Sequence, residues 1–333
     1  MKQRKLGTEM VSAIGLGCMN IAHAYGSPPP RDEAQALLRD ALDLGYTHLD
    51  TAYLYGFGLS EKLIGETLAD RRDEYFLASK CGMVRTPEGK RAIDNDPKIL
   101  KETCEQSLRF LKTDVIDLYY LHRWKKGTPI EDAVGALADL VKEGKIKAIG
   151  LSEVGSETLK KAQAVHPIAA LQTEYSLWTR NPEISVLDTC RELGVAFVAF
   201  SPLARAFLGG ELRDSSTLVE KDIRRFMPRF SPETYAENLK LLDAYAAVAR
   251  DVGCTMAQLA LAWLLAKGDD ILPIPGTANR QHLAENAAAA DIELDADTVA
   301  RLDALINEKT VVGPRYNAVA QSEVDTEEFS SAA

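Results

Sequence analysis

The sequence predicts a single (β/α)8 barrel, in which eight parallel strands alternate with the helices that surround them. Helical apolar spacing appears between successive short apolar segments, which is typical of a parallel sheet covered by helices. Eight such units close most naturally into a barrel. Because barrel strands are buried on both faces, they are expected to be apolar throughout. The eight strand-like segments lie near residues 14–17, 46–49, 76–80, 115–121, 147–151, 169–172, 195–200 and 271–274.

A short strand-turn-strand pattern precedes the first barrel unit. Residues 6–11 carry Gly7 at the turn and predict a small N-terminal β-hairpin. The helices that follow are expected at 32–44, 60–69, 97–111, 131–143, 156–165, 184–193, in a long region from 232 to 266, and at 296–306.

Several residue types predict where these helices begin and end. Gly45, Gly144 and Gly194 each follow a helical segment and predict its end. Thr128-Pro-Ile-Glu131 resembles a capping box at the start of a helix, and Asn181-Pro182 suits another helix start.

Two segments depart from the alternation of strands and helices. Residues 204–235 contain Gly209-Gly210 and Pro228, and predict a long, partly helical loop. In barrels such loops usually lie over the active site. From Tyr316 the chain is acidic and rich in small residues, so we expect about its last ten residues to be mobile. The predicted organisation is therefore a barrel over 1–315 and a partly mobile tail over 316–333.

The composition narrows the class of protein. A chain with 46% hydrophobic and 26% charged residues is ordinary for a globular protein with a large core. Its net charge of −10 argues against nucleic acids and anionic membranes as partners. A polar N-terminus and the lack of an apolar run of ~20 residues predict a cytoplasmic location. The five cysteines lack metal-type or paired spacing and are expected to be reduced thiols.

Titratable side chains stand at the ends of three successive predicted strands. Asp50 ends the second strand, and Tyr55 follows in a glycine-bearing loop. Lys80 and His122 end the third and fourth strands. Catalytic groups of barrels come from these strand ends. Each residue alone is more often structural, but an acid, a phenol, a cation and an imidazole together indicate one proton-transfer site.

These four groups suit the reduction of a carbonyl. A phenol has an unperturbed pKa of ~10, and a nearby ammonium favours its ionised form. Asp50 can balance the charge of a buried Lys80. His122 can donate a hydrogen bond to a carbonyl oxygen while Tyr55 supplies the proton. A separate donor would then deliver the hydride.

The segment Asp50-Thr-Ala-x-x-Tyr55-Gly, with Lys80 and His122, resembles the catalytic tetrad of the aldo-keto reductase superfamily. The resemblance covers roughly residues 5–310 and is strongest to its bacterial and plant branch. It implies a (β/α)8 barrel that binds NADPH in an extended form. It also implies that Tyr55 is the general acid, Lys80 and Asp50 its tuning pair, and His122 the carbonyl-orienting donor.

The same resemblance supplies a cofactor site, since the chain lacks a GxGxxG segment in the right context. Phe200 stands where relatives often stack a tyrosine on the nicotinamide, and Glu153 replaces a common asparagine. Ala278 replaces a common basic residue, so Arg280 is the candidate for the 2′-phosphate, with NADPH preferred and NADH possible. The helix beginning near Asn279 would present backbone N–H groups to a phosphate. The implied contacts are Ser152 and Gln172 to the nicotinamide amide, Ser201, Pro202, Leu203 and Arg205 to the pyrophosphate, and Gly276, Thr277, Arg280, Glu285 and Asn286 to the adenosine end.

Apolar residues on the predicted strand-end loops are candidates for the substrate pocket. They would form a roomy apolar site suited to an aromatic or cyclic carbonyl compound, and no pair of carboxylate-binding arginines is evident. The sequence leaves the physiological substrate and the reaction direction open. The candidates are Met19, Tyr25, Met83, Trp124 and Trp178.

Three other functions remain open at this point. A dehydrogenase of sugars or secondary alcohols would use the same residues. A cofactor-binding regulatory subunit could share the fold, although the intact tetrad argues against it. A metal-dependent barrel enzyme would need His-x-His or clustered carboxylates at strand ends, and neither is present, so no metal is expected. A monomer or a small homo-oligomer is compatible with the acidic surface.

Overall fold

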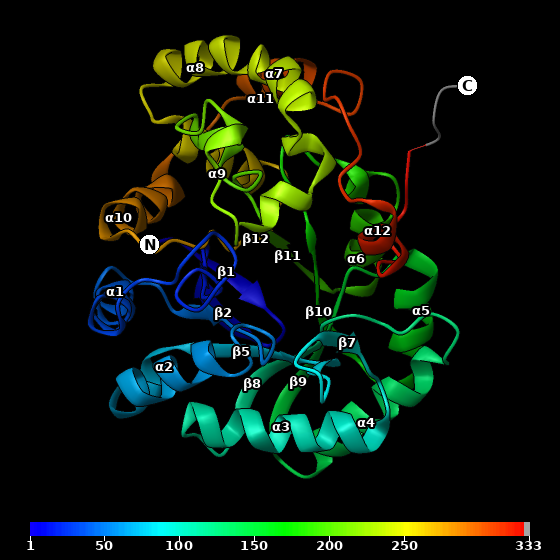
Figure 1. Cartoon of the computed structure of the whole chain (residues 1–333). Helices are drawn as coiled ribbons and strands as arrows, with labels where there is room; N and C mark the ends of the chain where they lie inside the picture. Colours follow the sequence, from blue (N-terminus) through cyan, green and yellow to red (C-terminus); the bar gives the residue numbers. More distant parts are fainter. Residues whose placement is uncertain (330–333) are drawn as a thin grey trace.

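The computed structural model describes residues 1–329 and has the predicted barrel at its centre (Figure 1). Every neighbouring pair in its eight-stranded sheet is parallel. All eight predicted strand segments are confirmed, and the boundaries differ by two residues at most. The strands, in sheet order, are β3 (Leu16–Gly17), β4 (His48–Asp50), β5 (Phe76–Cys81), β8 (Ile116–Leu121), β9 (Ile146–Ser152), β10 (Ile168–Glu174), β11 (Ala196–Phe200) and β12 (Ile271–Pro273).

The first and last strands close the sheet into a ring. The Gly17 N–H donates to the Pro275 carbonyl at 3.1 Å, and Gly17 forms a parallel bridge with Gly276. A Cβ on Gly17 would lie 2.8 Å from the Ile274 carbonyl oxygen. Closure at this seam therefore requires glycine, because any side chain would push the two backbones apart.

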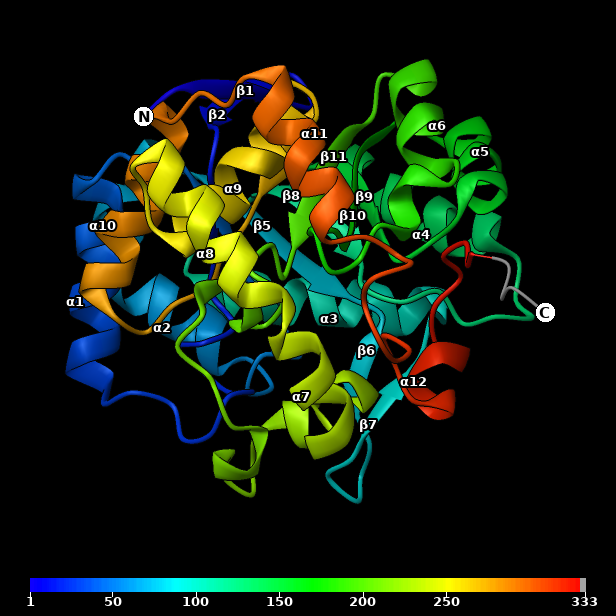
Figure 2. The same ribbon diagram turned by 90° about the horizontal axis from the view of Figure 1, so that it is seen from above.

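Helices cover the outside of the barrel (Figures 1 and 2). The long helical region expected at 232–266 is three helices, the last of which packs on the barrel. The outer helices are α1 (Arg31–Asp43), α2 (Leu59–Leu68), α3 (Pro97–Leu111), α4 (Ile130–Lys142), α5 (Ser156–Val165), α6 (Val186–Leu193), α9 (Met256–Ala266) and α10 (Arg280–Ala288), with α7 (Pro232–Leu239), α8 (Leu241–Val252) and α11 (Ala296–Leu305) beyond them. Within residues 1–329 no single helix has the length and hydropathy of a membrane span; α7 and α8 reach it with α9 only as a pair bent by 78°.

The N-terminal hairpin closes one end of the barrel. Strands β1 (Gln3–Leu6) and β2 (Glu9–Ser12) pair antiparallel about Gly7, whose φ is +62°. Leu6 and Val11 are fully buried and pack with Leu118 and Leu272 inside the barrel. The predicted hairpin is thus confirmed, and its apolar face seals the end of the interior away from the site.

Most predicted helix ends are confirmed, and two helix starts are wrong. Gly45, Gly144 and Gly194 follow α1, α4 and α6 with positive φ. Thr128 forms no capping box, because its hydroxyl donates to the Lys125 carbonyl while α4 begins without a side-chain cap. Asn181 begins a separate 3-10 turn, Asn181–Glu183, and α6 starts only at Val186.

The expected loop over the barrel is confirmed. Residues 204–235 form four 3-10 turns and the start of α7. The loop reaches the segment after β3. There the Ile223 N–H donates to the Ala24 carbonyl at 2.9 Å, and the backbones of Asp222 and Tyr25 form an antiparallel bridge. These contacts hold the loop across the open end of the barrel.

The C-terminal segment is docked where mobility was expected. Asp325 accepts from Thr158 at 2.6 Å, and Glu327 accepts from the Ser156 N–H at 2.8 Å. Both carboxylates therefore lie at the N-terminus of α5, where the helix dipole favours negative charge. The acidic side chains that suggested a solvated tail cap this helix in the structure, and the mobility of residues 324–329 stays a prediction. Residues 330–333, the rest of the predicted mobile stretch, lie outside the described residues.

Three further elements were not predicted. Strands β6 (Met83–Arg85) and β7 (Arg91–Ile93) form a hairpin after β5, and the short helix α12 (Ala318–Ser322) lies in the C-terminal segment. Arg91 pairs with Glu323 at 2.7 Å, which joins the hairpin to the segment after α12 (Figure 2). Elements distant in the sequence therefore meet at the rim of the barrel.

Candidate active site

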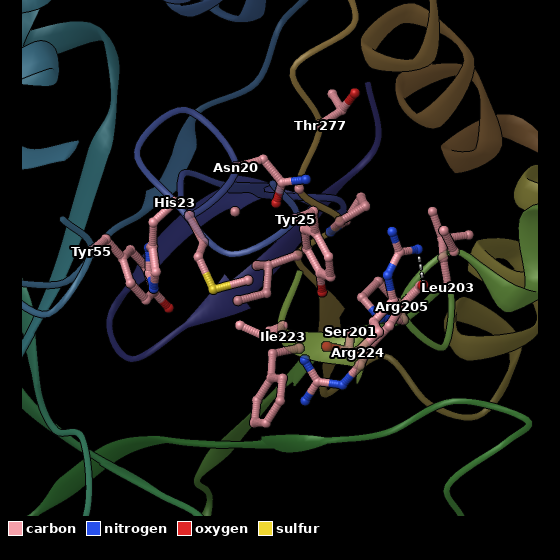
Figure 3. Close-up of a pocket in the computed structure, with 18 of the residues that line it drawn as sticks. Asn20, His23, Tyr25, Tyr55, Ser201, Leu203, Arg205, Ile223, Arg224 and Thr277 are labelled. Carbon is pink, nitrogen blue, oxygen red and sulfur yellow. Dashed lines mark hydrogen bonds between the residues drawn. The ribbon is translucent and has the colours of Figure 1, made fainter. Parts of the chain in front are cut away.

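A cavity of about 1100 Å³ opens at the C-terminal ends of the barrel strands (Figure 3). Its wall includes the strand ends, the loop after β3, the loop at 204–235 and part of the C-terminal segment. Among the predicted site residues, the cavity is lined by Asp50, Tyr55, His122, Ser152, Gln172, Phe200, Ser201, Pro202, Leu203, Arg205, Gly276, Thr277, Glu285, Asn286, Met19, Tyr25 and Met83.

Lys80 connects the acid and the phenol beneath the cavity floor. Its ammonium pairs with Asp50 and donates to the Thr51 carbonyl at 2.8 Å. The same group lies 3.3 Å from the Tyr55 hydroxyl. The Tyr55 and His122 rings are 6.0 Å apart and nearly perpendicular. The four predicted catalytic residues therefore form one cluster.

Burial sets the protonation of this cluster. Burial raises the pKa of Tyr55 above its ordinary value of 10, although Lys80 opposes the shift. Burial alone would lower the pKa of Lys80, but Asp50 and Tyr55 raise it, so the ammonium stays charged. Burial also holds the pKa of His122 well below 6.5, with Arg123 and Lys80 adding to the effect. Near neutral pH the cluster thus contains a protonated phenol, a charged lysine and a neutral imidazole.

The first turn of α2 supports both members of the Asp50–Lys80 pair. Thr51, next to Asp50, donates its hydroxyl proton to Ser60 at 2.8 Å. Ser79, next to Lys80, donates to Glu61 at 2.6 Å. The first-turn position of Ser60 and Glu61, directly after the tyrosine loop, was the only sequence signal for this role.

The charge of Glu61 in this support depends on the pH. Burial raises its pKa to about 7, although the hydrogen bond from Ser79 opposes the shift. Its second carboxyl oxygen has no hydrogen-bond partner among residues 1–329. The Glu61 carboxyl is therefore protonated and neutral at lower pH, and it becomes a buried carboxylate as the pH rises.

Arg123 links the tetrad to the predicted nicotinamide site and was not among the predicted residues. Its guanidinium donates to the His122 carbonyl at 2.7 Å and to the Ser152 hydroxyl at 3.2 Å. Gln172 makes a second link, since its amide donates to Asp50 at 2.7 Å. The only sequence signal for Arg123 is its place directly after His122.

A buried charge network lies behind the predicted cofactor wall. Glu174 pairs with Arg205 at 3.0 Å, and Glu153 pairs with Arg315. Arg315 also lies 3.6 Å from Glu174, and all four side chains are less than a tenth exposed. Glu153 thus binds a cation from the C-terminal segment, with its own backbone at a φ of +57°.

The predicted adenosine end differs from the expectation at two positions. Arg280 is not among the described residues that line the cavity; it pairs with Asp40 of α1 and is two-thirds exposed. The Asn279 side chain accepts from the N–H groups of Gln281 and His282 and so caps α10. Of the basic side chains in the first turn of α10, only His282 lines the cavity.

Two of the five predicted substrate residues do not line the cavity in the described part of the chain. Trp178 is buried in the core, stacked on Phe207 with ring centroids 4.2 Å apart. The Trp124 indole donates to the Thr128 carbonyl at 3.0 Å. Both tryptophans follow strand ends, but Trp178 packs in the core and Trp124 makes a hydrogen bond within its own loop.

The cavity residues suit a nicotinamide dinucleotide. The volume of the cavity is at the upper end of the range for ligand sites. A long cofactor bound beside a substrate requires a cavity of this size. Ser152 and Gln172 offer a hydroxyl and an amide beside the tetrad, and Thr277 and Asn286 offer polar groups at the far end. No group of three or more His, Cys, Asp or Glu side chains that could hold a metal ion occurs within residues 1–329.

Comparisons with known proteins agree with this geometry. An NADP(+) aldo-keto reductase of Schizosaccharomyces pombe is 42% identical over 327 residues, covering 96% of each chain. A glycerol dehydrogenase from Gluconobacter oxydans matches with a TM-score of 0.85 at 26% identity, covering 95% of this chain and 99% of the other. An aldo/keto reductase from Klebsiella pneumoniae in complex with NADP and acetate matches with a TM-score of 0.71 at 31% identity, covering 97% and 99%.

The family to which these proteins belong also matches by its sequence model. The model of the aldo/keto reductase family covers residues 13–307, which include every strand of the barrel and all four residues of the tetrad. The match spans most of the chain, as does the match to the yeast relative. This chain belongs to the aldo/keto reductase family.

Proposed function

We propose that this protein transfers a hydride between NADPH and the carbonyl carbon of an aldehyde or ketone, with Tyr55 as the general acid. The observation that carries the proposal is the buried Lys80 ammonium, which contacts both Asp50 and the Tyr55 hydroxyl beneath the cavity. A charged lysine in that place can stabilise the phenolate that forms when the proton leaves.

The residues divide the chemistry among them. When bound, the nicotinamide supplies the hydride. Tyr55 holds its proton until the carbonyl oxygen gains negative charge, and then donates that proton to the oxygen. His122 has its Nδ1 buried without a partner within residues 1–329, so Nε2 is the ring nitrogen that can donate to the same oxygen. Asp50 keeps Lys80 charged throughout.

The cofactor contacts of this proposal follow the cavity wall. Ser152 and Gln172 would hold the nicotinamide amide, and Phe200 would stack on the ring. Ser201, Pro202 and Leu203 would follow the pyrophosphate. Arg205 would do so through its backbone, because its guanidinium is engaged by Glu174. Gly276, Thr277, Glu285 and Asn286 would line the adenosine end.

NADPH is preferred over NADH on the evidence of relatives. The yeast relative is named for NADP(+), and the Klebsiella relative was solved with NADP. In this chain Arg280 could reach a 2′-phosphate only by leaving Asp40, whereas His282 already lines the cavity. We infer that one of these two side chains contacts the 2′-phosphate.

The substrate proposal rests on the apolar part of the cavity. Met19, Tyr25 and Met83 line the same cavity as the tetrad and favour an aromatic or cyclic carbonyl compound. Oxidation of a sugar or secondary alcohol is the second candidate, favoured by the structural match to a glycerol dehydrogenase. A cytoplasmic location and a monomer or small homo-oligomer remain predictions.

Calorimetric titration with NADPH and NADH, followed by turnover, tests the proposal. We expect NADPH to bind more tightly than NADH, and the bound NADPH to be oxidised on addition of benzaldehyde or acetophenone. NADP(+) reduction by secondary alcohols but no carbonyl reduction would favour the dehydrogenase. Tight cofactor binding without turnover in either direction would favour a regulatory subunit, and binding of neither cofactor would contradict the proposal.

A further inference from the structure

We propose that His23 selects substrates that carry a hydroxyl group on the carbon next to the carbonyl, so that the preferred class is α-hydroxy ketones and α-hydroxy aldehydes. This inference rests on the carbonyl reductase function proposed above. It assigns a substrate contact to a histidine outside the catalytic tetrad.

His23 and the tetrad histidine His122 both lie close to the Tyr55 ring. The His23 and Tyr55 ring centroids are 5.6 Å apart with an interplanar angle of 38°, whereas His122 approaches Tyr55 at 6.0 Å and 86°. All three side chains line the same cavity. Figure 3 shows the His23 ring directly beside Tyr55. A carbonyl compound bound at Tyr55 would therefore lie near a second imidazole besides His122.

The His23 ring has hydrogen-bonding capacity that the protein leaves unused. Its Nδ1 is buried and has no hydrogen-bond partner within residues 1–329. Burial also lowers the pKa of His23, so the ring is neutral near pH 7. The ring lines the cavity, and a ligand group that pairs with an unsatisfied polar atom recovers part of the cost of leaving it unpaired.

A hydroxyl group is the partner that fits a neutral imidazole best. Neutral histidine has one donor and one acceptor nitrogen, and the tautomer decides which of them faces the substrate. A hydroxyl can both donate and accept, so it pairs with either tautomer. A ketone oxygen can only accept. The second oxygen of an α-hydroxy carbonyl compound lies close to the first, so a substrate bound to Tyr55 through its carbonyl can present its hydroxyl to the neighbouring His23.

The backbone holds His23 in place before any ligand binds. The His23 N–H donates to the Met19 carbonyl at 3.0 Å. The next residue, Ala24, has a φ of +100°, which is strained for a residue with a Cβ. The Ala24 carbonyl accepts from the Ile223 N–H at 2.9 Å, so the loop at 204–235 fixes this conformation. Strain of this kind persists where the surrounding structure holds a side chain for function.

Other groups near the tetrad are less able to fill this role. Arg91 lines the cavity but already pairs with Glu323 at 2.7 Å. Met83 and Leu54, which also line the cavity, cannot hydrogen-bond strongly. A second polar atom on the substrate therefore finds its unengaged partner at His23.

The reaction leaves the neighbouring hydroxyl unchanged. NADPH provides the hydride to the carbonyl carbon, and Tyr55 provides the proton to the carbonyl oxygen, so the carbonyl π bond breaks and C–H and O–H bonds form. The products are a vicinal diol and NADP(+), and solvent returns a proton to Tyr55. His23 would act by orienting the substrate through the hydroxyl group.

The test compares 2-hydroxyacetophenone with acetophenone, which differ by one hydroxyl. Because the hydroxyl also alters intrinsic reactivity, the measured quantity is the ratio of the two kcat/KM values in each variant, relative to the wild type. We expect His23→Phe to lower this ratio about tenfold or more, since the phenyl ring fills similar space without a hydrogen bond. His23→Gln keeps a donor and an acceptor and should retain the ratio within about threefold.

Met19→Leu serves as the matched control on the same loop. It changes the shape of the cavity wall without removing a strong hydrogen-bonding group, so it should change both kcat/KM values by a similar factor. NADPH affinity, measured by calorimetry, checks that each variant is folded. If His23→Phe does not fold, His23→Leu replaces it in the comparison. A ratio that is retained in His23→Gln but lowered in His23→Leu then supports the inference.

The failure of this inference differs from the failure of the proposed function. Turnover of both compounds with an unchanged ratio in His23→Phe would overturn the role of His23 alone. A similar loss of ratio in Met19→Leu would show that cavity shape selects the substrate, and would also overturn it. Absence of turnover in the wild type, despite NADPH binding, would overturn the proposed function and this inference with it.

Discussion

The two sides of the barrel mouth balance their buried charges in different ways. On the tetrad side, Lys80 of β5 pairs with Asp50 of β4, the neighbouring strand, 30 residues earlier in the chain. On the cofactor side, Glu153 pairs with Arg315, which lies 162 residues away in the C-terminal segment. The proposed catalytic side is therefore assembled by adjacent strands, whereas the proposed cofactor side is complete only when the C-terminal segment has docked.

We expect this difference to separate effects on proton transfer from effects on cofactor binding. Removing a tetrad group should impair proton transfer and leave the cofactor wall intact. Removing a group from the Glu153–Arg315 network should instead destabilise the wall and weaken cofactor binding. The following variants test that separation, from the largest expected effect to the smallest.

Tyr55→Phe removes the proposed general acid. We expect kcat/KM for a carbonyl substrate to fall about 10³-fold or more, because the proton donor is lost while the ring still fills its place. NADPH affinity, measured by calorimetric titration, should stay within about twofold of the wild type. A large loss of NADPH affinity with little loss of turnover would contradict the separation of the two sides.

Arg315→Met leaves the buried Glu153 without its cation. The free energy of unfolding, measured with urea, should fall by about 3–5 kcal/mol, because an unpaired buried charge is costly. Adding Glu153→Gln should restore much of that loss. Arg301→Met is the matched control, since Arg301 and Asp251 form an exposed ion pair and the expected loss is below about 1 kcal/mol. Equal losses in Arg315→Met and Arg301→Met would show that the network is unimportant.

Glu61→Gln removes an acid whose pKa burial raises to about 7 from an ordinary value of 4.5. The unfolded chain loses this proton at lower pH than the folded chain, so the contribution of Glu61 to stability falls as the pH rises from about 4.5 through 7. Glutamine does not titrate. The stability of the variant relative to the wild type should therefore increase by about 1–3 kcal/mol between pH 5 and 8.

Urea unfolding at several pH values measures this difference. Glu102→Gln is the control for the loss of a glutamate, because Glu102 is more than half exposed on α3. Its stability relative to the wild type should change little with pH. A constant difference between Glu61→Gln and the wild type across this range would mean that Glu61 has an ordinary pKa.

Glu327→Ala removes a carboxylate from the N-terminus of α5. It accepts from Ser156 and Ser185, so its loss should cost about 1 kcal/mol, as for other helix caps. Because this contact helps dock the segment that carries Arg315, NADPH affinity should fall by about two- to threefold. Stability and NADPH affinity are measured by urea unfolding and calorimetry. Unchanged affinity in a destabilised variant would show that the end of the segment docks independently of the cofactor wall.

Arg280→Ala and Asp40→Asn together test the 2′-phosphate contact. If Arg280 reaches the phosphate, Asp40→Asn frees the Arg280 guanidinium and should raise NADPH affinity by about twofold, whereas Arg280→Ala should lower NADPH affinity. Neither variant should change the affinity for NADH. His282→Ala is the alternative variant at the same helix. A selective effect on NADPH in His282→Ala alone would assign the phosphate to the histidine.

A feature of the structure could be predicted from the sequence when its physical cause lies in neighbouring residues. The strands were found from short apolar runs because both of their faces are buried in the same way. Asp50, Lys80 and His122 were found because strand ends of a parallel barrel meet at one edge. Trp178 also follows a strand end, but its ring packs on Phe207 in the core, and a strand-end position does not specify in which direction a ring turns.

The position of the acidic C-terminal segment, by contrast, could not be predicted from neighbouring residues. By composition, Asp325 and Glu327 suggested a solvated and mobile end, since exposed carboxylates are typical of such segments. They are instead held at the N-terminus of α5, whose free N–H groups lie far away in the sequence. Arg280 was similarly placed in the cofactor site, because nothing near it in the chain indicated its pairing with Asp40.

The sequence by itself determined the barrel, its N-terminal hairpin, and the strand-end positions of Asp50, Lys80 and His122, because apolar periodicity and strand-end position act over a few residues at a time. Only the tertiary structure decided which charges neutralise Glu153 and Glu174, that Glu61 supports Lys80, and that His23 lies beside Tyr55 with an unpaired nitrogen. These outcomes depend on the distance between residues that are remote in the chain. The electrostatic cost of burying a charge or a polar atom is set by that distance, so it is absent from any local pattern.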